Sequence, residues 1–203
     1  MQIDTPVNTT RPKPSNSTLH SDDLLDQGLV DILNSDGVAV IPTDTIYGIV
    51  GRYDSPKAVQ KIRRLKNRGS DQAFIVLCAN IDQIRTFGVE EAHLKQADTH
   101  WPGKVSVILN TLHHWPDISG KLEGIGFRVP DNKELRSLLL QTGPLVAPSA
   151  NPKNDTPAWG IKQAEEYFGD KIGAYINYGL IKNTKPSKLL KISPDGTEDV
   201  LRA

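Results

Sequence analysis

The chain has 203 residues, 37% of them hydrophobic, and its 24 basic side chains are balanced by 24 acidic ones. This length and composition predict one globular domain whose core needs no disulfides. Proteins that bind nucleic acid or membranes in bulk usually carry a net charge, so a neutral chain argues against that class. The only cysteine, Cys78, excludes a disulfide within the chain, and its apolar neighbours predict a buried, unreactive thiol.

The N-terminal segment differs in composition from the rest of the chain. Residues 1–19 are polar, contain three prolines and lack the apolar stretch of a signal peptide. We therefore expect 1–19 to form a flexible tail and 20–203 to form a single catalytic domain. No apolar run is long enough to span a bilayer, so we expect no membrane contact and a reduced, cytoplasmic location.

Helix and strand signals alternate through the first half of this domain. Helices are predicted where a capping residue or proline precedes an apolar stripe, and strands where apolar residues run together or alternate. In chain order, the predictions are a helix from Ser21 that Gly37 ends, a strand at 38–41, a helix from Ser55-Pro56, a strand at 74–79, a helix at 90–99 and a strand at 104–110.

The second half follows the same alternation. In chain order, we predict a strand at 126–129, a helix with an Asp131/Glu134 capping box that ends at Gln141, a strand at 145–147, a helix from Thr156-Pro157 to Phe168, strands at 175–177 and 189–192, and a returning strand at 200–201 after an Asp195-Gly196 turn. Continuous apolar strands separated by helices predict an α/β sheet covered on both faces.

Residues 57–68, KAVQKIRRLKNR, carry six basic side chains and no acidic one. Cations in a last helical turn complement the helix dipole, which explains one of them but not six. If Lys66 and Arg68 leave the helix together, they can converge on one anion, with a point charge from lysine and a planar fork from arginine. The remaining four are predicted to form a solvated helix face: Lys57, Lys61, Arg63 and Arg64.

Two polar turns follow predicted strands, PTDTIYG at 42–48 and APSAN at 147–151. Each could be an ordinary turn with local side-chain caps. Ligands of α/β proteins, however, bind at strand ends. Together with Lys66 and Arg68, the two turns predict a cavity for a multiply anionic ligand. No Walker loop, G-x-G-x-x-G turn or H-E-x-x-H helix occurs, so neither those nucleotide-binding loops nor a zinc site is predicted.

PTDTIYG, KNR, WPGKVSVIL, FRVPDN and APSAN, in this order, resemble the YrdC-like family of threonylcarbamoyl-AMP synthases. The similarity runs from about residue 21 to the end and implies the short, single-domain form. It also implies the YrdC-like fold, a twisted mixed α/β sheet flanked by helices with a large concave basic cavity. The implied reaction condenses L-threonine, bicarbonate or CO2, and ATP into L-threonylcarbamoyladenylate, with release of pyrophosphate.

The resemblance assigns roles to individual residues. The catalytic pair is Lys66 and Arg68. The implied ATP contacts are Lys66, Arg68, Ser149, Asn151 and Arg202. The implied threonine contacts are Thr43, Thr45, Tyr47, Arg68 and Ser187. Further candidates are Asp44, Lys104 and Arg128, of which Lys104 stands where the family usually has proline. Gly69 likewise follows Arg68 in place of a proline.

The resemblance also implies partners. A threonylcarbamoyl transferase complex is expected to move the product's acyl group onto tRNA next to the anticodon, with at most weak tRNA contact by this chain. Mg²⁺ is expected to arrive with ATP, without a dedicated protein site. Asp44 could orient either the threonine amine or that ion. The alternative function is a non-catalytic RNA-binding paralogue, in which the clustered cations contact phosphates.

Overall fold

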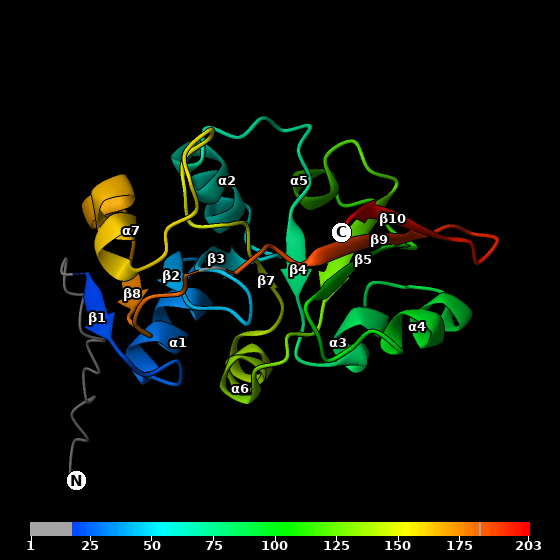
Figure 1. Cartoon of the computed structure of the whole chain (residues 1–203), viewed down its shortest axis with the longest axis horizontal. Helices are drawn as coiled ribbons and strands as arrows, with labels where there is room; N and C mark the ends of the chain where they lie inside the picture. The colour runs from blue at the N-terminus through cyan, green and yellow to red at the C-terminus, as the bar shows by residue number, and fades with distance from the viewer. Residues whose placement is uncertain (1–17, 183) are drawn as a thin grey trace, which may run out of the picture.

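The computed structural model describes residues 18–182 and 184–203. One ten-stranded sheet runs through the molecule in the order β1-β8-β2-β3-β7-β4-β6-β5-β9-β10 (Figure 1). The strands are β1 (Leu19–Ser21), β2 (Ala39–Ile41), β3 (Gly48–Arg52), β4 (Ile75–Leu77), β5 (Val105–Asn110), β6 (Gly124–Arg128), β7 (Leu145–Val146), β8 (Ala174–Ile176), β9 (Lys188–Ile192) and β10 (Glu198–Arg202). The helices are α1 (Gln27–Asn34), α2 (Pro56–Leu65), α3 (Ile81–Arg85), α4 (Glu91–Asp98), α5 (Pro116–Ser119), α6 (Lys133–Thr142), α7 (Ile161–Phe168) and the 3₁₀ turn η1 (Gly169–Lys171).

Helices cover both faces of the sheet. In Figure 1, α2, α5 and α7 lie on one side, and α1, α3, α4 and α6 lie on the other. Residues that alternate along a strand enter different buried clusters: Val40 and Val76 join one, and Ala39 and Leu77 join the other. The sheet is therefore buried on both faces, which confirms the predicted α/β architecture with a mixed sheet.

The pairing of β7 brings two distant segments together. β7 runs antiparallel to both β3 and β4. The end of β7 therefore lies beside the start of β4, and the Ala147 amide donates to the Ile75 carbonyl over 2.9 Å. This places the turn at 147–151 next to the segment that leaves α2.

The first helix begins later than predicted. Ser21 does not cap a helix, because it ends β1, which pairs in parallel with β8. The cap of α1 is Asp26, whose carboxylate accepts from the Gly28 amide over 2.8 Å. Leu19, the last residue of the expected tail, is the first residue of β1. The other described residue of that expected tail is Thr18, and 1–17 lie outside the described residues.

Two further helix starts were also wrong. Asn132, and not Asp131, caps α6, with its side-chain oxygen accepting from the Leu135 amide over 2.9 Å. The last helix, α7, begins at Ile161, so Thr156 and Pro157 lie in the preceding loop. That loop folds back on the 147–151 turn, because the amide of Ala158 donates to the carbonyl of Ala150.

Cys78 is fully buried, as predicted, and burial raises the pKa of its thiol. Among the helices of residues 18–182 and 184–203, none is long and apolar enough to cross a membrane.

Candidate active site

A cavity of about 180 Å³ lies where many of the predicted site residues meet. The predicted residues that line it are Thr43, Thr45, Arg68, Arg128, Ser149, Ser187 and Arg202. Three guanidinium groups and four hydroxyl groups therefore face one small space. Sites for whole small molecules usually measure roughly 300–1,000 Å³. This cavity can enclose an amino acid or a phosphate group, but the rest of a nucleotide must extend beyond it.

The side chains of Lys66 and Arg68, at the end of α2, lie in different surroundings. Lys66 is the C-cap residue, and Asn67 has a φ of +48°, a left-handed conformation that asparagine tolerates better than most residues. The Arg68 amide closes the helix by donating to the Arg63 carbonyl over 2.9 Å. Lys66 and Arg68 both lie just beyond the helix, but only Arg68 lines the cavity, so the two cations do not converge there.

Lys66 fastens the 147–151 turn to the end of α2. Its buried ammonium donates to the carbonyls of Ser149, over 2.5 Å, and Asn151, over 2.6 Å. Burial, and secondarily the charge of Arg68, lowers the pKa of Lys66 to about 7, whereas the two carbonyl acceptors favour its charged form. Lys66 therefore positions this turn, and it is poised to gain or lose charge near neutral pH.

Arg68 is held against an aromatic ring. Its guanidinium carbon lies 5.0 Å from the ring centroid of Phe74, and Nη2 donates to the Ala73 carbonyl. Burial, followed by the charge of Arg63, lowers the pKa of Arg68. Its Nε is buried and has no acceptor within the described part of the chain. A ligand oxygen could supply that acceptor.

Arg128 reaches the cavity from the end of β6 and pairs with Asp44. Arg128 Nη2 lies 3.1 Å from Asp44 Oδ1, and the two side chains are only 6% and 2% exposed. Burial lowers the pKa of Arg128, the Asp44 carboxylate opposes this shift, and Arg202 adds to it. The Asp131 amide donates to the other Asp44 oxygen over 3.2 Å. Asp44 is thus engaged as a counter-ion.

The hydroxyls of the 42–48 turn form a local network. Thr43 Oγ1 donates to the Ile46 carbonyl over 2.6 Å and lies 3.0 Å from Thr45 Oγ1. A hydroxyl has one proton, so in this arrangement Thr45 donates to Thr43. The Thr45 amide also donates to Thr43 Oγ1 over 3.2 Å. Thr43 therefore shapes the turn, and both side chains border the cavity.

The last strand closes the opposite side of the cavity. Arg202 donates from Nε and Nη2 to the Ser187 carbonyl, over 3.0 and 2.8 Å. The Ser187 hydroxyl lies 2.8 Å from that of Ser106, which ties it to β5. The antiparallel β9–β10 pair thus brings the end of the chain to the site.

Besides Lys66 and Asp44, three further predicted residues do not line the cavity. Tyr47 is fully buried, donates to the Gly179 carbonyl and accepts from the Tyr178 amide, both over 2.9 Å. Asn151 lies beside the cavity, where its Oδ1 accepts from the Ser149 hydroxyl over 2.5 Å. Lys104 is exposed on the approach to β5. Their contacts to ligands stay predictions.

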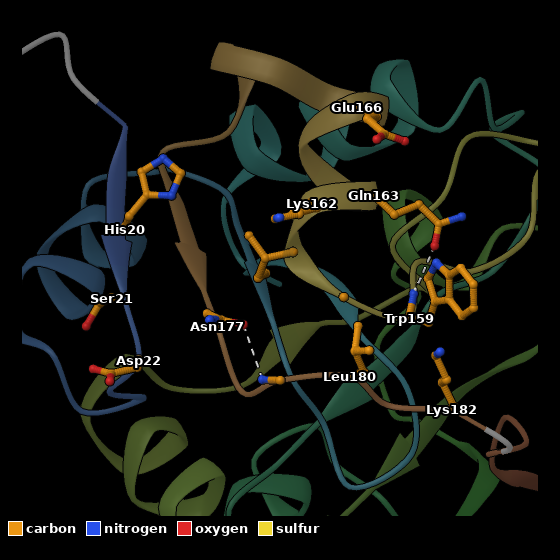
Figure 2. A pocket seen from close by; sticks show the side chains of 13 residues that line it. His20, Ser21, Asp22, Trp159, Lys162, Gln163, Glu166, Asn177, Leu180 and Lys182 are labelled. Atoms are coloured by element: carbon orange, nitrogen blue, oxygen red, sulfur yellow. Dashed lines mark hydrogen bonds between the residues drawn. The ribbon is translucent and has the colours of Figure 1, made fainter.

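A larger cavity, of about 900 Å³, lies between β1, the loop after β8 and the start of α7 (Figure 2). Its lining includes His20, Trp159, Lys162, Leu180 and Lys182, none of which the sequence singled out. Its walls carry both acidic and basic groups, and its aromatic residue stands half-exposed. The smaller cavity has the chemistry for an anion, because the charged side chains that line it are all arginines.

Within the described residues, no group of three or more His, Cys, Asp or Glu side chains could hold a metal ion. The carboxylate of Asp44 is already paired with Arg128, which lines the cavity. The donor set of the cavity therefore suits an anion.

The mixed sheet and its arginine-lined cavity define a class, that of α/β proteins equipped to bind a small, multiply anionic ligand. Known proteins with similar sequences identify the family within this class. The family model for Sua5, YciO and YrdC, described as "Telomere recombination", matches residues 31–203. The chain belongs to this family, which confirms the resemblance found in the sequence.

Known proteins support both the family and the fold. The threonylcarbamoyl-AMP synthase of Marinobacter nauticus is 34% identical over 163 residues, which cover 77% of this chain and 85% of that protein. Among solved structures, E. coli YciO has a TM-score of 0.76 at 24% identity, covering 91% of this chain and 93% of its own. P. abyssi Sua5 complexed with L-threonine has a TM-score of 0.79 at 21% identity, covering 91% of this chain and 56% of the longer Sua5 chain.

Proposed function

We propose that this chain is a threonylcarbamoyl-AMP synthase. It joins L-threonine, bicarbonate or CO2, and ATP into L-threonylcarbamoyladenylate and releases pyrophosphate. One structural observation carries the proposal: Arg68, Arg128 and Arg202 share a small cavity with hydroxyls from both strand-end turns. The synthase relative from Marinobacter nauticus and the threonine bound to P. abyssi Sua5 support the choice of reaction and amino acid.

The arginines address the main physical obstacle of this reaction. Threonine, bicarbonate and ATP each carry a negative group, so bringing them together costs electrostatic energy until cations neutralise them. Arg68 and Arg128 each have a buried Nε without an acceptor in the described part of the chain. Ligand oxygens bound there would gain charge-assisted hydrogen bonds without displacing a partner. Arg202, held by Ser187, adds a third positive charge.

The proposed chemistry needs positioning more than covalent help from the protein. The neutral threonine amine forms a bond to the carbon of CO2 and releases one proton, which gives a carbamate. With bicarbonate, the amine attacks the same carbon, and the amine proton leaves together with a hydroxide as water. A carbamate oxygen then attacks the α-phosphorus of ATP in line, and the bond to pyrophosphate breaks. Lys66 holds the Ser149 turn in place, while Arg68 and Arg128 stabilise the charge that develops on the phosphate oxygens.

Partners and cofactors follow from the same chemistry. Mg²⁺ would arrive with ATP, without a dedicated protein site, and would offset the negative charge of the phosphates. The adenylate is reactive and must be handed to a transferase complex that modifies tRNA next to the anticodon. The proposed location of the reaction is the cytoplasm. The RNA-binding alternative has no observation of its own in its favour.

Pyrophosphate release tests the proposal. The full chain is incubated with ATP, Mg²⁺, threonine and bicarbonate, and each component is then omitted in turn. We expect release only when all are present. Release that does not depend on threonine would contradict the proposed reaction. No release by folded protein that binds RNA with a steep salt dependence would favour the non-catalytic alternative.

A further inference from the structure

Arg63 belongs to the basic stretch of α2, but it is not a solvated surface cation as predicted. Its guanidinium donates from Nη1 to the carbonyls of Gly69 and Gln72, the latter over 3.0 Å. Nη2 donates to the Asp117 carbonyl over 2.7 Å. The next residue, Arg64, is exposed, and its side chain makes no hydrogen bond to the described residues. Two adjacent arginines of one helix thus have different surroundings.

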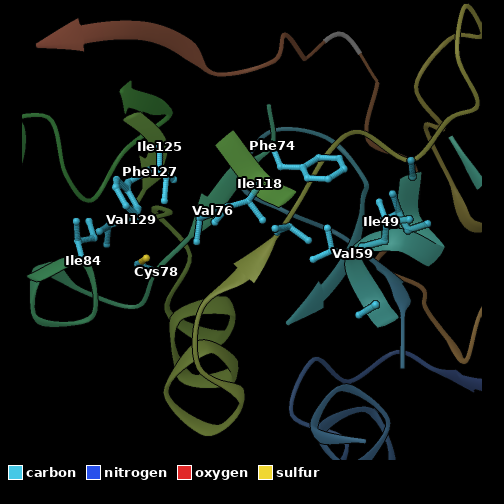
Figure 3. Packing of buried hydrophobic residues seen from close by; sticks show 14 of the residues in the cluster. Ile49, Val59, Phe74, Val76, Cys78, Ile84, Ile118, Ile125, Phe127 and Val129 are labelled. Atoms are coloured by element: carbon cyan, nitrogen blue, oxygen red, sulfur yellow. The ribbon is translucent and has the colours of Figure 1, made fainter. Parts of the chain in front are cut away.

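Arg63 and Arg68 share one aromatic ring. Their guanidinium carbons lie 4.5 and 5.0 Å from the centroid of Phe74. Phe74 is 1% exposed, and its amide is fixed by the Ile118 carbonyl over 2.8 Å. Figure 3 shows Phe74 within the buried cluster that also contains Ile118. The buried ring is therefore held in place, and both guanidinium groups form cation–π contacts with it.

The two arginines hold the loop that follows Arg68, residues 69–73, at both of its ends. Arg63 holds the carbonyls of Gly69 and Gln72, and Arg68 holds that of Ala73. Gly69 brings more backbone freedom than any other residue type, so this loop needs outside contacts to keep one shape. Burial lowers the pKa of Arg63, but an arginine side chain stays charged at neutral pH. Arg63 therefore keeps its positive charge.

We propose that Arg63 is a positioning residue for Arg68: it fixes the 69–73 loop and the Phe74 ring against which the Arg68 guanidinium lies in the cavity. The proposal rests on the proposed function for its kinetic readout. Small displacements of a group that stabilises a transition state have large kinetic effects. We therefore expect Arg63→Ala to lower kcat/KM for threonine-dependent pyrophosphate release about tenfold.

A double-mutant cycle distinguishes positioning from a general loss of structure. Arg63→Ala, Arg68→Ala and the double variant are compared, with Arg64→Ala as the matched control from the same helix. We expect the Arg63 substitution to have no further effect once Arg68 is absent, and Arg64→Ala to behave as wild type. Equal fractional losses in both backgrounds, or full activity of Arg63→Ala, overturn the proposal. Arg63→Lys keeps the charge but not the fork, so we expect it to remain impaired.

Hydrogen exchange supplies a second readout that does not depend on activity. In Arg63→Ala, amides within 69–74 are expected to exchange faster than in wild type, while Arg64→Ala leaves them unchanged. Unchanged exchange in Arg63→Ala overturns the positioning role. If the wild-type chain releases no pyrophosphate but the exchange difference is found, the proposed function fails and the role of Arg63 in shaping the loop stands.

Discussion

Arg128 and Asp44 form a buried ion pair that joins the end of β6 to the turn after β2. Their nearest charged atoms are 3.1 Å apart, and both side chains are almost fully shielded from solvent. Arg128 also faces the charge of Arg202 across the cavity, which lowers its pKa further. Asp44 thus offsets part of the repulsion among the cavity arginines.

Asp44→Asn leaves Arg128 buried without its counter-ion, so we expect the free energy of unfolding to fall by about 3–5 kcal/mol. Denaturant titration measures the loss. Asp36→Asn is the matched control, because Asp36 pairs with Lys57 over 3.5 Å at the exposed surface, where one substitution usually changes stability by less than about 0.5 kcal/mol. Equal stability of the two variants would show that the buried pair has no structural role.

Arg68 is expected to stabilise charge in the transition state. Arg68→Ala should lower kcat for pyrophosphate release about 10²-fold, the usual effect of removing one such group. Lys57→Ala, from the exposed start of the same helix, serves as the control and should keep wild-type activity. Retention of activity by folded Arg68→Ala would exclude Arg68 from the chemical step.

Ser149 and Ser187 border the cavity from different strands and are predicted to serve different substrates. Loss of one hydrogen bond to a charged ligand costs about 1.5–3 kcal/mol, or roughly ten- to a hundredfold in affinity. Calorimetry of Ser149→Ala should show this loss for ATP, and Ser187→Ala should show it for threonine. Each variant serves as the control for the other. If Ser149→Ala weakened threonine binding and Ser187→Ala weakened ATP binding, the two assignments would have to be exchanged.

We expect nucleotide binding to depend on pH, because the pKa of Lys66 lies near neutrality. Its pKa of about 7 means that the free protein loses this charge as the pH rises above neutrality. A bound anion favours the charged form, so binding takes up a proton, and ATP affinity should fall by up to about tenfold per pH unit above pH 7. Lys66→Met removes the group and should flatten this dependence. An identical slope in both proteins would assign it to another residue.

Capping residues in the sequence predicted the helix starts that are fixed by contacts between neighbouring residues. Ser55 caps α2 as predicted, because its hydroxyl accepts from the Ala58 amide three positions later. Ser21 looked equally suitable, but its partner strand, β8, lies more than 150 residues away, and a capping pattern does not report such a partner. Pairing across the chain thus overrode a local preference.

The same limit applies to the site. The strand-end turns and the residues after α2 were recognised from their composition, and β7 brings them together. Arg63 was misread because its acceptors are backbone carbonyls at 69, 72 and 117, which have no side-chain signature. Asp44 was assigned to a substrate or an ion, because only the fold places Arg128 beside it.

The most direct test of the proposed reaction is the identity of its product. The protein is incubated with ATP, Mg²⁺, threonine and ¹³C-bicarbonate, and the adenylate is identified by mass spectrometry. We predict threonylcarbamoyl-adenylate that contains the ¹³C label between the threonine nitrogen and the phosphate. An unlabelled threonyl-adenylate, or no adenylate from folded protein that binds ATP, would contradict the proposed function.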